Sequence, residues 1–163
     1  MKTLLIIRHA KAENAFTLND FERSLNERGR SDAPVMAKRI LHRKIMIDAF
    51  VSSPAKRAKK TAELFCAAYG QDEKDIMYVS ALYQAAPETF FEIVSGLQDK
   101  FNSVALFSHN PGITLFAGQL TPEIKLDNMP TCSVFAVQAN IEHWSGFGKA
   151  KKEFLFFDYP KNV

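Results

Sequence analysis

The sequence predicts an α/β fold: a three-layer α/β/α sandwich with a mainly parallel sheet, in a single domain that spans residues 1–163. Short apolar runs alternate with amphipathic segments of helical periodicity, and this β-α-β-α order favours a parallel sheet with helices on both faces. The chain of 163 residues is long enough to bury a proper core. No internal repeat and no low-complexity linker divides it.

The N-terminal segment begins with a strand and continues into a helix. Residues 3–7 form a compact apolar run that ends in a charged pair, which indicates a buried strand. After a polar loop, Asn26 can cap a helix that runs to about Arg43. Pro34 interrupts the pattern, so we expect it to kink this helix or to restart it from Ser31.

The middle of the chain repeats the alternation of strand and helix. Residues 48–52 predict a second strand. Pro54 opens a helix that runs to about Tyr69 and is stopped by Gly70. Residues 75–80 indicate a short strand.

The last part of the chain contains two helices and three strands. One helix begins at Pro87 and a second begins at Pro111, where proline suits the first helical turn. Between them, residues 103–107 predict a buried strand. Residues 132–139 alternate as a strand should, and residues 152–157 indicate a final strand.

Composition and charge narrow the function classes. Hydrophobic residues make up 47% and charged residues 24% of the chain, as in ordinary globular domains. The cysteines Cys66 and Cys132 are too few for a disulfide framework, and the N-terminal apolar run is too short for a signal peptide or membrane span. We therefore expect a cytoplasmic protein with no membrane partner. The net charge of +3 suits an anionic substrate but not nucleic acid, and the basic residues 56–60 are read as a solvated helix face.

Polar residues follow three of the predicted strands. They are Arg8 and His9, residues 52–54, and residues 108–112 with His109 among them. Ligands bind at the carboxyl edge of such a sheet, and Arg57 falls in the first turn of the helix that follows the second strand. Two arginines and two histidines at one edge would form a compact, cationic, metal-free oxyanion pocket.

Phosphoryl transfer requires these residue types. Charge develops on three equatorial oxygens, so positioning and electrostatic stabilisation supply most of the catalysis. A guanidinium binds two oxygens in a fixed fork, which lysine cannot do. A neutral imidazole is a competent nucleophile near neutral pH, and helix N-termini add amide donors.

Three sequence blocks resemble the histidine phosphatase superfamily, which includes phosphoglycerate mutases and acid phosphatases. Residues 5–10 (Leu-Ile-Ile-Arg-His-Ala) are similar to its Arg-His-Gly signature. Residues 52–62 resemble the block Ser-Pro-x-x-Arg-Ala-x-x-Thr-Ala, and residues 108–112 resemble a block that usually reads Gly-His-Asn-Pro. The blocks occur in the expected order and span most of the chain.

Within the superfamily, the chain most resembles the short phosphohistidine phosphatases of the SixA type. That group lacks the long helical insertion that mutases carry between the second and third blocks, and here Arg57 and His109 are only 52 positions apart. Residues 20–29 resemble the group's Asp-x-x-Arg-Pro-Leu-x-x-x-Gly segment, and residues 82–83 and 129–131 match further short blocks.

The resemblance implies a role for each matching position. His9 would be the nucleophile that becomes phosphorylated. Arg8, Arg57 and His109 would bind the phosphoryl group and stabilise its transition state. Arg23 would add a phosphate contact specific to the short group. No cofactor and no metal is implied.

The sequence departs from the family pattern at three positions. Ala10 replaces the usual glycine after the nucleophile, Ser24 replaces a common proline beside Arg23, and Ser108 replaces a common glycine before the second histidine. Taken alone, His9 and His109 could be hydrogen-bonded structural histidines, and Arg57 and Arg23 could be surface arginines. Zinc binding by the histidines has no support from a His-x-x-His or Cys/His cluster.

The general acid is an open point. Larger members of the superfamily carry a glutamate between the second and third blocks that protonates the leaving oxygen. In the matching residues 82–88 the only carboxylate is Glu88, which fits an N-terminal helix charge and, as the alternative, a general acid. Without a strong acid, phosphoramidates and aryl phosphates should react faster than sugar phosphates.

The expected function is hydrolysis of phosphohistidine in a protein partner, by resemblance to the short group. A phosphatase of small phosphorylated metabolites is the first alternative. A non-catalytic module that binds phosphorylated partners is the second, although such a module would have little need of an intact His9.

Overall fold

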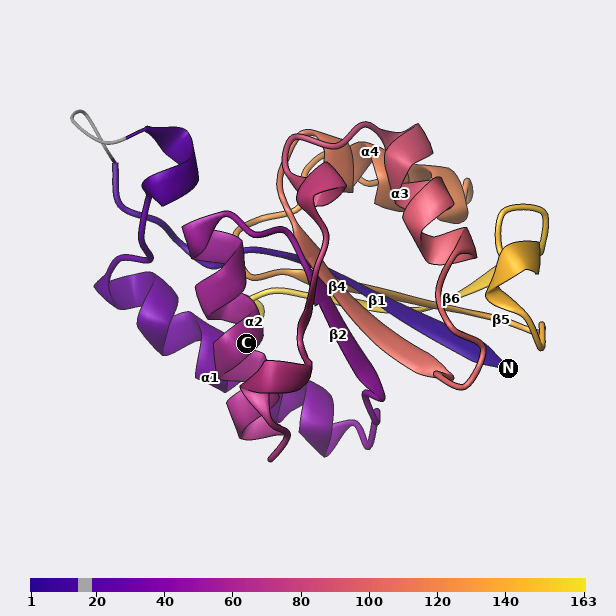
Figure 1. The fold of residues 1–163 in the computed structure, drawn as a ribbon, viewed down its shortest axis with the longest axis horizontal. Coiled ribbons are helices and arrows are strands. Elements are labelled where there is room, and N and C mark those ends of the chain that lie inside the picture. The colour runs from indigo at the N-terminus through magenta and orange to yellow at the C-terminus, as the bar shows by residue number, and fades with distance from the viewer. Residues whose placement is uncertain (15–18) are drawn as a thin grey trace.

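A computed structural model describes residues 1–14 and 19–163. A six-stranded sheet lies between two layers of helices (Figure 1). In chain order the strands are β1 (Lys2–Arg8), β2 (Ala49–Ser52), β3 (Met77–Tyr78), β4 (Ser103–Ser108), β5 (Val134–Ala139) and β6 (Lys152–Asp158). The helices are α1 (Glu27–His42), α2 (Lys56–Ala68), α3 (Pro87–Ser95) and α4 (Gly112–Leu120).

The sheet has the strand order β3-β2-β4-β1-β5-β6. The first four strands in this order pair in parallel, whereas β5 runs antiparallel to β1 and β6 runs antiparallel to β5. The predicted three-layer α/β/α sandwich with a mainly parallel sheet is therefore confirmed, with two antiparallel pairings at one side. Because β2, β4 and β1 are parallel neighbours, their carboxyl ends lie at one edge of the sheet.

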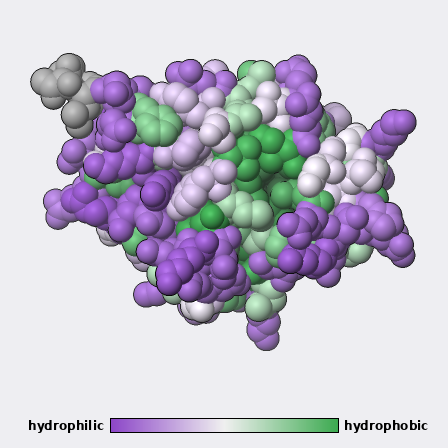
Figure 2. All heavy atoms as spheres, viewed as in Figure 1, coloured by the Kyte–Doolittle hydropathy of each residue, from purple (hydrophilic) through white to green (hydrophobic). Residues whose placement is uncertain are grey.

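Alternate residues of the strands contribute to two separate cores. On β1, Leu5 and Ile7 pack in the core beneath α1 and α2, whereas Leu4 and Ile6 pack in the core beneath α3 and α4. All four side chains are fully buried, as period-2 alternation requires when both faces of a sheet are covered. On the α3 side an area of hydrophobic residues reaches the surface (Figure 2), and half-buried side chains of α3 such as Ile93 pack on that core.

Helix α1 differs from its prediction at Pro34. Asn26 caps the helix as expected, because its side-chain oxygen accepts a hydrogen bond of 2.9 Å from the backbone N–H of Gly29. The helix then runs unbroken to His42 with Pro34 inside it, so the expected restart at Ser31 is wrong. Proline removes one backbone donor, and the burial of Ala33 and its neighbours on the same face outweighs that loss.

Other helix and strand boundaries differ from the sequence prediction by a few residues. β3 is shorter than the predicted strand at 75–80, because 3-10 turns at Glu73–Asp75 and Ser80–Leu82 occupy both ends of that segment. α2 and α4 begin one or two residues after Pro54 and Pro111. None of the helices in the described part of the chain combines the length and the apolar character that crossing a bilayer requires.

Candidate active site

The carboxyl edge of the sheet carries a cavity of about 660 Å³. It lies where β1, β2 and β4 end, so Arg8 and His9 approach it from one strand and His109 from another. Arg57 enters from the first turn of α2. Arg8, His9, Arg23, Arg57 and His109 all line this cavity, so the structure brings together the five positively charged or imidazole side chains that the sequence singled out.

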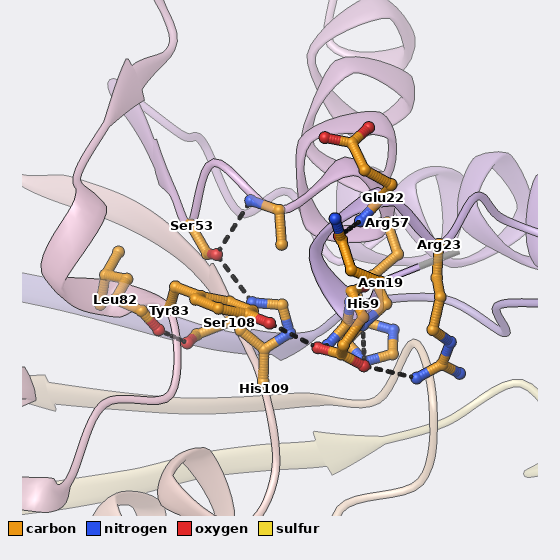
Figure 3. A network of polar contacts seen from close by, with 12 residues as sticks. His9, Asn19, Glu22, Arg23, Ser53, Arg57, Leu82, Tyr83, Ser108 and His109 are labelled. Atoms are coloured by element: carbon orange, nitrogen blue, oxygen red, sulfur yellow. Dashed lines mark hydrogen bonds and ion pairs between the residues drawn. The ribbon is translucent and has the colours of Figure 1, made fainter. Parts of the chain in front are cut away.

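His9 is buried, and its hydrogen bonds define which ring nitrogen is free. Nδ1 lies 2.8 Å from the carbonyl oxygen of Ala10. A carbonyl can only accept, so Nδ1 carries the proton and Nε2 presents its lone pair. The Nε–H of Arg57 donates to that lone pair over 3.3 Å. His9 is thus orientated with Nε2 as the available nucleophilic atom (Figure 3).

The surroundings of His9 keep it neutral. Burial lowers the pKa of His9 well below the usual value of 6.5, and the positive charges of Arg57 and Arg8 act in the same direction. The hydrogen bond to Ala10 opposes this shift without overcoming it. A neutral imidazole retains the lone pair that a nucleophile needs.

Thr61 fixes the position of His9 relative to α2. Its hydroxyl accepts a hydrogen bond of 2.9 Å from the backbone N–H of Ala10 and donates one of 2.8 Å to the carbonyl oxygen of Arg57. Thr61 is fully buried. The residue after His9 and the residue that contacts His9 are therefore connected through one side chain.

Asp20 is a carboxylate in the middle of this cationic site. It lies in the 3-10 turn Asp20–Glu22, and Arg57 donates to its carbonyl oxygen over 2.7 Å and to Oδ2 over 2.8 Å. Arg23 donates to Oδ1 over 2.9 Å, and the hydroxyl of Tyr83 donates to Oδ2 over 2.7 Å (Figure 3). Burial alone would raise the pKa of Asp20, but the hydrogen bonds from Tyr83, Arg23 and Arg57 outweigh it and hold that pKa well below its usual range.

His109 faces His9 across the cavity, with the two ring centroids 5.3 Å apart. Burial, followed by the charge of Arg57, lowers the pKa of His109 to about 3, so this ring is also neutral at neutral pH. Its Nε2 lies 2.7 Å from the hydroxyl oxygen of Ser53. Its Nδ1 is buried and has no hydrogen-bond partner among the described residues.

Arg8 also has an unused donor. Its Nη1 donates to the carbonyl oxygen of Met129 over 2.8 Å, whereas its Nε is buried without a partner in the described part of the chain. Burial, and then the charge of Arg57, lowers the pKa of Arg8 from its usual value. Arg23 is more exposed, and its Nε donates to the carbonyl oxygen of Glu13.

Glu88 lies apart from this group. It is exposed in the first turn of α3 and is not among the residues that line the cavity. The only carboxylate among the described lining residues is Asp20. The structure therefore does not bring the candidate general acid to the cavity, and its position fits the N-terminal helix charge that was its other interpretation.

The sequence reasoning assigned no role to Asp20, Ser53, Thr61 or Tyr83, although all four lie in the motif blocks. Asp20 precedes Arg23 by three residues, which is the spacing at which side chains of one helical turn meet. That spacing was a usable signal for their ion pair. The contacts of Tyr83 and Ser53 bridge 63 and 56 positions, and no local pattern indicates them.

A family model supports the resemblance that the sequence suggested. Residues 4–82 match the histidine phosphatase superfamily (branch 1). This match includes the first two sequence blocks and the turn that carries Asp20 and Arg23. Comparison with curated protein sequences finds no match.

Solved structures extend the similarity to the whole chain. A phosphohistidine phosphatase SixA described from Agrobacterium tumefaciens is 25% identical, with 98% of each chain covered and a TM-score of 0.80. A protein histidine phosphatase SixA complexed with tungstate is 21% identical at the same coverage, with a TM-score of 0.83. A mycobacterial glucosyl-3-phosphoglycerate phosphatase, 16% identical over the full length of both chains, has a TM-score of 0.66. The similarity to the histidine phosphatase superfamily, and within it to SixA-type structures, is confirmed.

Proposed function

We propose that this chain, which shares the fold of histidine phosphatases and matches their family model over residues 4–82, is a metal-independent phosphatase that forms a phosphohistidine on Nε2 of His9. Support comes from a buried neutral imidazole whose Nε2 carries a lone pair, with the Nε–H of Arg57 on that lone pair and with Arg8 beside it, whose Nε has no partner among the described residues. Arg8, Arg57 and His109 bind the phosphoryl oxygens, and Arg23 adds an outer contact.

In the first half-reaction, Nε2 of His9 attacks the phosphorus atom. The new N–P bond forms as the bond from phosphorus to the leaving group breaks, and the leaving group takes the bonding electron pair. Nδ1 keeps its proton throughout and continues to donate it in the hydrogen bond to the carbonyl oxygen of Ala10, so the ring stays aligned. Arg57 releases Nε2 and donates instead to a phosphoryl oxygen, where charge develops.

In the second half-reaction, water attacks the phosphorus of phosphorylated His9. The N–P bond breaks, its electron pair returns to Nε2, and the water proton that is lost goes to solvent or to the departing phosphate. The products are inorganic phosphate and unmodified His9.

The preferred substrate is phosphohistidine in a protein, and one observation carries this choice. The only carboxylate among the described cavity residues, Asp20, is held ionised by Arg23, Arg57 and Tyr83, so it is a poor proton donor. A sugar alkoxide needs a proton as it leaves. The imidazole of a phosphohistidine, protonated on its other nitrogen, leaves as a neutral molecule and needs no acid.

The test is the dependence of the rate on the leaving group. Rates measured for a phosphohistidine peptide, a series of aryl phosphates and a sugar phosphate should fall steeply as the leaving-group pKa rises. Glu88→Gln should leave the whole series unchanged. A flat series in which Glu88→Gln slows only the poor leaving groups would make Glu88 the general acid and would favour a phosphatase of small metabolites.

A non-catalytic binding module is distinguished by trapping the intermediate. Rapid acid-free denaturation during turnover should leave an alkali-stable phosphate on His9, found by mass spectrometry.

Turnover should also persist in the presence of EDTA, because the arginines supply the positive charge. Loss of activity in EDTA with recovery on adding zinc or magnesium would contradict the metal-independent proposal.

A further inference from the structure

Ser53 lies directly behind the second histidine of the cavity and is fully buried. Its hydroxyl oxygen is 2.7 Å from Nε2 of His109 and also accepts a hydrogen bond of 3.2 Å from the backbone N–H of Ala55. We propose that Ser53 is a positioning residue that fixes His109 in the tautomer with the proton on Nδ1, so that this N–H is ready to donate to a phosphoryl oxygen.

The proton of the Ser53 hydroxyl carries the first step. The N–H of Ala55 can only donate, so it uses one lone pair of the Ser53 oxygen. Among the described residues, the only acceptor recorded within reach of the hydroxyl proton is Nε2 of His109. A hydroxyl that donates to Nε2 requires Nε2 to be unprotonated.

The neutrality of His109 carries the second step. A neutral imidazole has one N–H, and when Nε2 is unprotonated that N–H is on Nδ1. Nδ1 is buried without a partner among the described residues, on the side of the ring that is turned toward His9 (Figure 3). A buried N–H without an acceptor is costly in a folded protein, and such donors in an active site are typically satisfied by a ligand.

The opposite tautomer would work against anion binding. With the proton on Nε2, the Nδ1 lone pair would face the oxygens of the phosphoryl group and repel them. The proton of Ser53 would also be left without an acceptor in a fully buried position. Ser53 thus converts a ring that could present either a donor or an acceptor into one that presents a donor.

The first experiment observes the tautomer directly. Nitrogen NMR of the protein labelled with ¹⁵N-histidine should show His109 with a pyridine-like (unprotonated) Nε2 and a pyrrole-like (protonated) Nδ1. The chemical shift of the Nδ1–H signal should change when tungstate is added. In Ser53→Ala the two nitrogens should exchange roles or average. A pyrrole-like Nε2 in the unmodified protein would overturn the inference.

The second experiment measures the consequence with a matched control. Ser53→Ala should weaken tungstate binding and lower turnover by roughly tenfold to hundredfold, because His109 would no longer hold an N–H toward the charged oxygens, and one hydrogen bond to a charged group contributes about that factor. Ser52→Ala is the control, because Ser52 is the adjacent, equally buried serine and its hydroxyl donates to a backbone carbonyl instead. Equal losses in both variants would reduce Ser53 to a packing residue.

The inference rests on the proposed function only in the turnover measurement. Tungstate binding and the NMR signals need no catalysis, so they test Ser53 even if the protein hydrolyses none of the substrates tried. Absence of turnover with a normal tautomer and a Ser53-dependent tungstate affinity would reject the phosphatase and retain the role of Ser53.

Discussion

The two edges of the sheet both bury positive charge, but they satisfy it differently. At the amino edge, Lys2 is 2% exposed, and its Nζ donates to the carbonyl oxygens of Asp99 and Phe101 and to Oδ1 of Asn102. An ammonium has three N–H groups, and here each has an oxygen. At the carboxyl end of the same strand, the Nε of Arg8 has no partner in the described part of the chain.

We propose that this difference separates a structural cation, Lys2, from a phosphate-binding one, Arg8. A buried donor that lacks a partner costs free energy, so natural folds keep few of them. All three N–H groups of Lys2 at the amino edge donate to oxygen atoms within the fold. Nε of Arg8 and, in the proposed tautomer, Nδ1 of His109 each keep an N–H that the described protein atoms do not use, and an incoming phosphoryl group would accept from both.

The largest effect is expected from a variant at the carboxyl edge that removes the imidazole of His9, the proposed nucleophile. We expect His9→Ala to lower turnover by at least about a thousandfold, because it deletes the covalent route. Tungstate binding should remain measurable, since the arginines still bind the anion. The exposed histidine His42 supplies the control, and His42→Ala should behave like the unmodified protein. Substantial residual turnover in His9→Ala would rule out a phosphohistidine on this residue.

The next test keeps the charge at the carboxyl edge and changes its geometry. Arg57→Lys retains a cation but loses the fork that reaches two oxygens, and we expect turnover to fall by about a hundredfold, as when one oxyanion donor is removed. Lys59→Arg, a change on the exposed side of the same helix, should have no effect on steady-state rates. A nearly normal rate in Arg57→Lys would show that only charge matters there.

A third test measures how His109, at the carboxyl edge, makes the free energy of unfolding depend on pH. The pKa of His109 is about 3 in the fold, against 6.5 when it is unperturbed. Below pH 6.5 the unfolded chain therefore binds a proton that the folded chain does not. We expect His109 alone to lower the free energy of unfolding by about 1.4 kcal/mol for each pH unit from 6 to 4. Urea unfolding of His109→Asn should show a shallower pH dependence, and an unchanged slope would place the effect elsewhere.

The smallest expected effect concerns the amino edge. Lys2→Met fills similar space but leaves the acceptors around Nζ unsatisfied, so the free energy of unfolding should fall by about 1–3 kcal/mol. Turnover at saturating substrate should stay unchanged. Lys38→Met, at an exposed position of α1, is the control for loss of a lysine without loss of these contacts. A loss of turnover without a loss of stability in Lys2→Met would abolish the distinction between the edges.

The strand ends were predictable from the sequence because two general rules agree there. Apolar runs place β1, β2 and β4 inside a parallel sheet, and parallel strands bring their carboxyl ends together. Arg8, His9 and His109 follow directly from those runs, so little is left to tertiary contacts. Arg57 follows from a helix that begins just after β2.

The remaining contacts depend on loops, which carry no periodicity. Asp20 meets Arg57 across 37 positions because of the path of the turn before α1, and nothing local in the sequence specifies that path. Glu88 lies in a predictable helix, but whether that helix turn faces the cavity is set by how α3 packs on the sheet. The restart of α1 at Ser31 was wrongly expected because local propensity was weighed without the burial that holds α1 together.

The hydrogen bond from Arg57 to Nε2 of His9 also limits the reactivity of His9 in the resting protein. A neutral imidazole is a nucleophile, and it reacts with acylating reagents such as diethyl pyrocarbonate. In the resting protein the attacking lone pair is covered by the Nε–H of Arg57, and the ring itself is only 6% exposed. Diethyl pyrocarbonate should therefore label the exposed His42 and His143 long before His9. In the proposed reaction, the lone pair of His9 becomes available only when a phosphate-like dianion draws the guanidinium of Arg57 away.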